Sequence, residues 1–161
     1  MMVFVRILAG LAFACALALP AAAQSLVLKG PAGQSRTLPL AELAAMPHQT
    51  VTMTDHGHTR SYSGVPVSAL LALVGAPQGE ALHGKAISDL VVVSAADGYR
   101  VLLALAETDP VMRSEQVIVA DQADGAPLDA HEGPLRLIVE GDKRPARSAR
   151  EVQSIKVRIL P

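Results

Sequence analysis

YSGVPVSALL, residues 62–71, joins an extended segment to an amphipathic helix without any intervening loop. Pro66 stands where a helix tolerates proline best, in its first turn. Residues 67–74 then place apolar side chains at helical spacing, and Gly75 with Pro77 ends the pattern. The stretch therefore predicts a strand that runs directly into a short helix.

The segments on either side of this stretch alternate between short strands and turns. Apolar spacing predicts helices over residues 38–46 and 105–112. Asp97-Gly98 and Asp124-Gly125 are pairs typical of tight turns, and residues 55–58 read as a polar loop. Runs that are alternating, β-branched or continuously apolar predict strands at residues 26–28, 51–54, 62–65, 90–95, 99–103, 116–120, 135–139 and 155–159. Since strands outnumber helices, we expect an α+β domain with a mostly antiparallel sheet and short helices.

The first 23 residues have the pattern of a secretory signal peptide. Arg6 precedes an apolar run over residues 7–19, Pro20 breaks that run, and three alanines lead to Gln24. A permanent membrane anchor is the competing interpretation, but the run is shorter than the ~20 apolar residues that span a bilayer. Cys15 lies inside the run, which is a poor context for lipid attachment. The sequence therefore predicts export to the periplasm, with one domain over residues 24–161.

Removal of residues 1–23 would change the composition that matters for function. The only cysteine leaves with this segment, so no disulfide or thiolate ligand remains. Without Arg6, thirteen basic residues face fifteen acidic ones, and this near-neutral balance gives no reason to expect a nucleic-acid partner. Tyr62 and Tyr99 are the only aromatic residues left. Aliphatic side chains must therefore fill the core.

Four segments, in order, resemble one protein family. They are the GVP helix start at residues 64–66, the DGY turn at 97–99, the strand GPLRLIV at 133–139, and the ARSAR segment at 146–150. Together they are similar to the sulfite-oxidase-type oxidoreductase molybdopterin-binding domain. The resemblance covers most of residues 24–161 and implies the sulfite-oxidase-like fold. It also implies a pterin cofactor.

Two departures from the family pattern bear on chemistry. Enzymes of this family ligate molybdenum through a cysteine located between an early strand and the GVP helix, and residues 55–61 contain none. The metal centre needs that soft thiolate. Glu151 also stands where a tryptophan often follows the ARS segment. We therefore expect no catalytic residues and no oxygen-atom transfer, because a fold can persist without its chemistry.

The basic segment over residues 143–150 is the first candidate binding site. The resemblance assigns Arg147, Ser148 and Arg150 to the segment that grips the pterin, and a helical turn would place both arginines on one face. Charge-assisted hydrogen bonds of this kind contribute about 1.5–3 kcal/mol each. The alternative is a solvated charge run before an edge strand, where cations oppose aggregation.

His56, His58, Tyr62 and Tyr99 complete the candidate ligand-binding residues. The two histidines could hold zinc or copper, but His-x-His without a third ligand at a diagnostic spacing favours a plain polar loop, so no metal site is predicted. This loop occupies the place where the family ligates its cofactor, and we expect it to border the pocket. Each tyrosine either stacks on a flat ligand or packs in the core.

These observations favour a periplasmic, non-catalytic binding protein. It would hold a pterin-like small molecule without molybdenum and signal to a membrane-bound receptor or signalling enzyme, a partner that the resemblance implies. A molybdopterin-dependent oxidoreductase, or its subunit, with altered metal ligation is the second hypothesis. A structural domain without ligand is the third.

Overall fold

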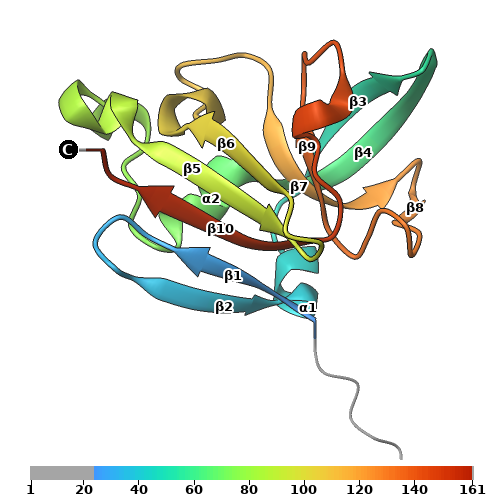
Figure 1. Ribbon diagram of the computed structural model, residues 1–161, viewed down its shortest axis with the longest axis horizontal. Helices are drawn as coiled ribbons and strands as arrows, with labels where there is room; N and C mark the ends of the chain where they lie inside the picture. The colour runs from blue at the N-terminus through green and yellow to red at the C-terminus, as the bar shows by residue number, and fades with distance from the viewer. Residues whose placement is uncertain (1–23, 161) are drawn as a thin grey trace, which may run out of the picture.

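The computed structural model describes residues 24–160, so the predicted signal peptide at residues 1–23 lies outside the described residues. Two five-stranded sheets and a few short helices make up this region. Figure 1 shows the first sheet on the left and the second on the right. No helix among residues 24–160 is both long and apolar enough to cross a bilayer.

The first sheet has the order β2-β1-β10-β5-β6. Its strands β1 and β10 are parallel, and its other pairs are antiparallel. The predicted hairpin at Asp97-Gly98 joins β5 to β6. The strands span Ser25–Lys29 (β1), Ser35–Pro39 (β2), Leu90–Ala95 (β5), Arg100–Ala104 (β6) and Val152–Arg158 (β10).

The second sheet is built around β7, which pairs with β4 on one side and with β8 and β9 on the other. All of its pairs are antiparallel. Strand β3 pairs with the outer edge of β4. The strands span Gln49–Asp55 (β3), His58–Pro66 (β4), Val117–Ala123 (β7), Ala126–Pro127 (β8) and Arg136–Val139 (β9).

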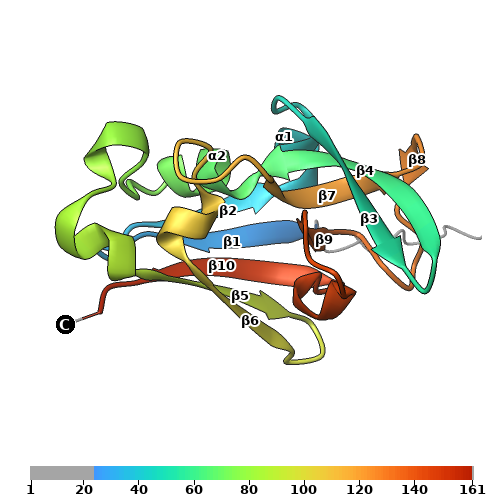
Figure 2. The same cartoon turned by 90° about the horizontal axis from the view of Figure 1, so that it is seen from above.

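The helices are short, as the sequence predicts. Strand β4 runs directly into α2, with Pro66 at the boundary. Both α-helices lie on the same side of the first sheet (Figure 2). The α-helices span Leu40–Ala44 (α1) and Val67–Ala72 (α2), and the 3-10 turns span Gly79–Ala81 (η1), Gly84–Ser88 (η2), Leu105–Thr108 (η3) and Pro145–Arg147 (η4).

The core is aliphatic and has two parts. The larger part lies between the sheets, where Leu28, Val93 and Ile155 of the first sheet are 0% exposed. Strand β7 alternates, sending Val119 into this core and Ile118 into a smaller cluster on the far face of the second sheet. Because the second sheet is buried on both faces, any charged side chain in its middle must find partners inside the protein.

Three details of the predicted secondary structure were wrong. Residues 35–39 form β2, an edge strand that the sequence did not predict. The helix predicted over residues 38–46 is consequently reduced to Leu40–Ala44. The helix predicted over 105–112 is the 3-10 turn Leu105–Thr108, which ends before Pro110 because proline has no amide hydrogen to continue a helix. The α+β class and the mostly antiparallel pairing are confirmed.

Candidate functional site

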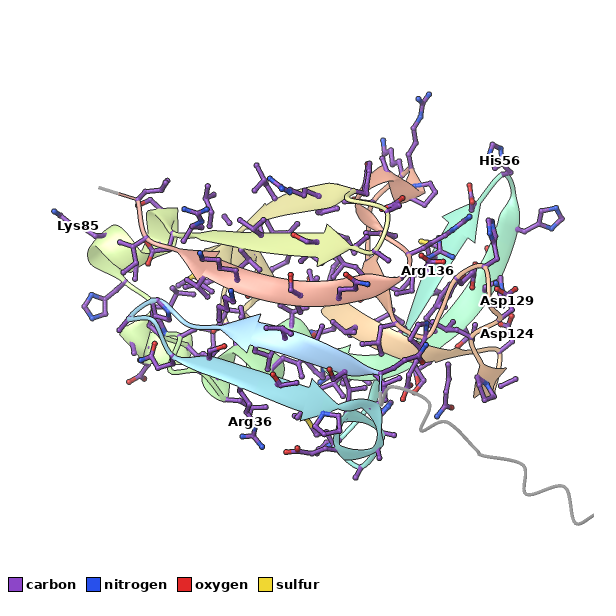
Figure 3. All side chains as sticks on the ribbon, turned by 60° about the horizontal axis from the view of Figure 1, so that its bottom comes forward. Arg36, His56, Lys85, Asp124, Asp129 and Arg136 are labelled. Carbon is purple, nitrogen blue, oxygen red and sulfur yellow. The ribbon has the colours of Figure 1, made fainter. Side chains whose placement is uncertain are left out.

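Arg136 lies at the meeting point of two hollows of about 250 Å³ each. Figure 3 shows it beside the β3–β4 hairpin, whose tip carries His56. The hairpin hollow, as we name it, also contains His58, Arg60, Tyr62 and Glu132 in its lining. The segment hollow is lined by Tyr99, Ser148, Arg150 and their neighbours. Six of the seven predicted binding residues therefore lie around one arginine.

The guanidinium of Arg136 is almost entirely buried. Its residue is 2% exposed, and it is the one charged side chain in β9, all of whose residues are buried. It forms an ion pair with Glu132, and its Nη1 donates to the hydroxyl of Tyr62 at 2.9 Å. Its Nε has no hydrogen-bond partner among the described residues. A buried donor without an acceptor costs about 1–3 kcal/mol.

Tyr62 fills the floor of the hairpin hollow between two cations. The guanidinium carbons of Arg60 and Arg136 lie 5.4 and 5.3 Å from the centroid of its ring. Burial raises the pKa of Tyr62, so the phenol stays protonated at neutral pH. Its oxygen accepts hydrogen bonds from both arginines. Among residues 24–160 the hydroxyl, whose residue is only 1% exposed, takes part in hydrogen bonds only as an acceptor.

The charge of Arg60 is balanced by two carboxylates. Its Nε donates to Asp124 at 2.9 Å, and its Nη1 donates to Glu132 at 3.0 Å. The hydrogen bond with Asp124 raises the pKa of Arg60 above its usual value, and it lowers the pKa of the Asp124 carboxyl. Arg60 and Arg136 thus face two carboxylates, and the hairpin hollow has little net charge.

The β3–β4 hairpin turns in two residues, His56 and Gly57, both with positive φ. Such a turn suits the twist of paired strands, and only glycine adopts it without strain. The predicted loop at residues 55–58 is shorter than expected, because Asp55 and His58 pair within the strands. His56 and His58 are both exposed at the rim of the hollow. Among residues 24–160, no three His, Cys, Asp or Glu side chains form a group that could hold a metal ion.

The segment hollow draws on both sheets. Tyr99, immediately before β6, is half-exposed, and its hydroxyl donates to the carbonyl oxygen of Ala146 at 2.8 Å. Ser148 is buried, and its Oγ accepts from the amide of Val139 at 3.3 Å. Arg150 is exposed and donates to Nε2 of His131, since a guanidinium has no lone pair with which to accept. Arg150 and the ring of Tyr99 thus remain accessible to a ligand.

Arg147 lies apart from these residues. It donates to Asp142 at 2.7 and 2.9 Å and to Glu107 at 3.0 Å, and it lines neither hollow. The turn η4 ends at Arg147, so the helical face that the sequence predicted for Arg147 and Arg150 does not form. The hydrogen bonds from Arg147 lower the pKa of the Asp142 carboxyl.

A cleft larger than either hollow lies elsewhere. It measures about 760 Å³ and is bordered by β1, α1, residues 128–135 and the start of β10. Its lining contains no histidine, arginine, lysine or tyrosine. Size favours this cleft, whereas buried charge and donors favour the hollows at Arg136. We place the candidate site at Arg136, because recognition of a polar heterocycle depends on directed donors and acceptors.

The sequence predicted binding residues in the ARS segment and in the β3–β4 hairpin. It did not predict a role for the arginine between them, Arg136, which stands in the quoted GPLRLIV motif. An arginine inside a run of four aliphatic residues was a usable signal, because such a charge is rarely buried without a partner. Glu132 four residues earlier was a visible counter-ion. Arg60 carried no comparable signal, since its partner Asp124 is far away in the sequence.

Comparison with known proteins bears on this arrangement. The family model described as "Oxidoreductase molybdopterin binding domain" matches residues 16–159. No curated protein sequence matches the chain. The fold is similar to that in the crystal structure of the sulfane dehydrogenase SoxCD from Paracoccus pantotrophus, with a TM-score of 0.65 and 20% identity over 85% of this chain. The match covers 38% of the SoxCD chain, so the present chain spans less than half of that relative.

Proposed function

The chain belongs to the oxidoreductase molybdopterin-binding domain family, and from this membership we propose that it binds a pterin-like heterocycle at Arg136 without ligating molybdenum. The proposed protein is a binding protein and not a catalyst. Each hollow is smaller than the ~300–1,000 Å³ of a typical small-molecule pocket. A single bicyclic ring system suits them better than a dinucleotide.

The unpaired Nε of Arg136 is the observation that carries this proposal. A ring nitrogen or carbonyl oxygen of a pterin is an acceptor that would satisfy it. Tyr62 offers a phenol proton from the hairpin hollow, and Arg150 offers a guanidinium from the segment hollow. Tyr99 presents an exposed ring for stacking. These groups suit a flat ligand with donors and acceptors along its edge.

The residues present fit the pterin but not its metal. The chain's one cysteine, Cys15, lies outside residues 24–160, and the hairpin at the expected ligand position offers only imidazoles and a carboxylate. Molybdenum in this family requires a thiolate, so we derive no redox step for this chain. Elemental analysis tests this point, and we expect molybdenum well below one atom per chain in protein purified from its native host.

A molybdopterin-dependent oxidoreductase, or a subunit of one, is the second candidate. The observation that favours it is the family match itself, which covers almost all of the described residues. One equivalent of molybdenum per chain would establish it in place of the binding protein.

We also propose that the protein is exported and signals to a membrane-bound receptor. The order of charge, apolar run and small residues before Gln24 supports export. Periplasmic material should begin at Gln24 when its N-terminal residue is determined. An N-terminus at Met1 would refute export, and a lipidated Cys15 would replace the soluble periplasmic form by a membrane-anchored one.

Titration with oxidised and reduced pterins tests the ligand. A chain without tryptophan leaves pterin fluorescence almost free of protein background. We expect Arg150→Gln to weaken binding by about 10- to 150-fold, the equivalent of one charged hydrogen bond of 1.5–3 kcal/mol. Arg144→Gln is the matched control, since Arg144 is exposed in the same segment and lines neither hollow. If the wild type binds no pterin at millimolar concentration, the pterin proposal fails and a structural domain takes its place.

A further inference from the structure

The outer face of the first sheet carries a basic hollow of about 440 Å³. Figures 1 and 2 show both α-helices on the opposite side of this sheet. The cations in its lining are Lys29, Arg100, Lys156 and Arg158, and no aspartate or glutamate lines it. We call these four residues the basic face. None of them forms an ion pair with another residue between 24 and 160.

The basic face does not follow from an overall positive charge. With thirteen basic and fifteen acidic residues between 24 and 161, the protein is slightly acidic. Elsewhere in the described region cations pair with carboxylates, as at Arg60 and Arg147. Concentration of cations without counter-ions on one face creates a local positive potential that attracts anionic partners.

Two of these cations stand side by side at a cost to stability. Lys29 of β1 and Lys156 of β10 are register partners. Neighbouring strands lie about 4.8 Å apart, and like charges directly opposite one another are destabilising. Both strands are interior to the sheet, so protection of an exposed sheet edge does not explain these lysines. A partner that supplies negative charge would offset the repulsion.

We propose that the basic face docks an extended, acidic segment of another protein. Alternate side chains of an extended segment are about 6.6–6.8 Å apart. Lys156 and Arg158, two residues apart on β10, have the same spacing, so they can face successive acidic side chains. Ser94 and Ser154 in the lining of the hollow add short hydroxyl groups that can donate to, or accept from, a peptide backbone. A second copy does not fit face to face, because two basic faces repel.

This inference is independent of the pterin site. None of the basic-face residues lines either hollow at Arg136. Failure of pterin binding and failure of peptide docking are therefore read out in separate titrations.

The test is fluorescence anisotropy with a labelled peptide of alternating glutamate and serine, about ten residues long so that it spans the sheet. We expect saturable binding that weakens as salt is added. The double variant Lys29→Gln/Lys156→Gln should bind about tenfold more weakly, because exposed charge pairs contribute about 0.2–1 kcal/mol each. The same variant should melt at the wild-type temperature or slightly above, since the lysine repulsion is gone.

The matched control is Lys85→Gln/Arg144→Gln, which removes the same charge from exposed positions outside the hollow. This control should bind the peptide like wild type. Equal weakening by both double variants would show non-specific attraction and overturn the proposal, as would the absence of any peptide binding. Vesicles containing phosphatidylglycerol form the second arm. Binding to these vesicles but not to the peptide would make a membrane the partner and would also refute the proposal.

Discussion

Replacement of Glu132 by glutamine removes the counter-ion that keeps the Arg136 charge inside the protein. Glu132 accepts from Arg136 and, at 3.0 Å, from Arg60. The side chains of Arg136 and Glu132 are only 3% and 9% exposed. Arg60 keeps Asp124 as a partner in the variant, whereas Arg136 keeps only the neutral hydroxyl of Tyr62. The cost of the substitution therefore falls on Arg136.

The magnitude follows from the burial of this pair. Loss of one partner from a buried ion pair costs about 3–5 kcal/mol. Glutamine keeps one acceptor oxygen at the same place, so we expect Glu132→Gln to lower the free energy of unfolding by about 2–4 kcal/mol. In a domain of this size 1 kcal/mol corresponds to about 3–5 °C. The melting temperature should fall by about 10 °C.

A second substitution separates the charge from the packing. Arg136→Met removes the guanidinium and keeps a flexible apolar side chain in place of the arginine stem. Buried ion pairs replaced on both sides are often neutral for stability. We therefore expect Glu132→Gln/Arg136→Met to recover most of the stability that Glu132→Gln loses. Despite its recovered stability, the double variant should bind no pterin, because the Nε donor is gone.

Urea unfolding followed by far-ultraviolet circular dichroism measures all four members of this cycle. The coupling free energy between the two positions should reach about 1.5 kcal/mol or more. A cost below about 1 kcal/mol for Glu132→Gln, or two substitutions whose effects simply add, would show that Arg136 is not a buried charge held by Glu132. The argument for a ligand donor at Arg136 would then lose its basis.

Two further predictions concern residues outside the hollows. Arg147→Ala should cost about 1 kcal/mol at pH 7, the upper end for a partly exposed ion pair. Because Arg147 lowers the pKa of Asp142, this stability is present above the unfolded aspartate pKa of about 3.9 and is lost as pH falls through the lower folded value. The difference between wild type and variant should shrink between pH 5 and pH 2, and a constant difference would contradict this. Gly64→Ala should lower the free energy of unfolding by about 3 kcal/mol or more in the same assay, since its Cβ would lie 2.1 Å from the carbonyl oxygen of Val119. The control Gly125→Asn, in an open turn, should lower it far less.

Local patterns were sufficient to predict most of the fold. The β4–α2 junction follows from Pro66, and the β5–β6 hairpin follows from Asp97-Gly98 between two apolar runs. Strand β2 was missed because it buries only Leu38 and shows no alternation. Its strand character comes from pairing with β1, a contact that no local pattern reveals.

The candidate site was predictable where its residues are close in sequence. The ARS segment and the hairpin were identified from motifs, and the structure brings Ser148, Arg150 and the two histidines to hollows that meet at Arg136. Their binding roles stay predictions. The place of Arg60 in the site could not be predicted, because Arg60 contacts Asp124 only through the pairing of β4 with β7.

The difference between Arg147 and Arg136 shows what a motif leaves undetermined. Arg147 carries the stronger family resemblance, yet three hydrogen bonds to Asp142 and Glu107 already use its donors. Arg136 has an ion pair as well, but its Nε is left without an acceptor. A cation in a sequence is therefore a candidate for ligand binding only if the fold leaves one of its donors without a hydrogen-bond partner. Glu107 is forty residues from Arg147, so that balance is set by tertiary contacts and cannot be read from a basic run alone.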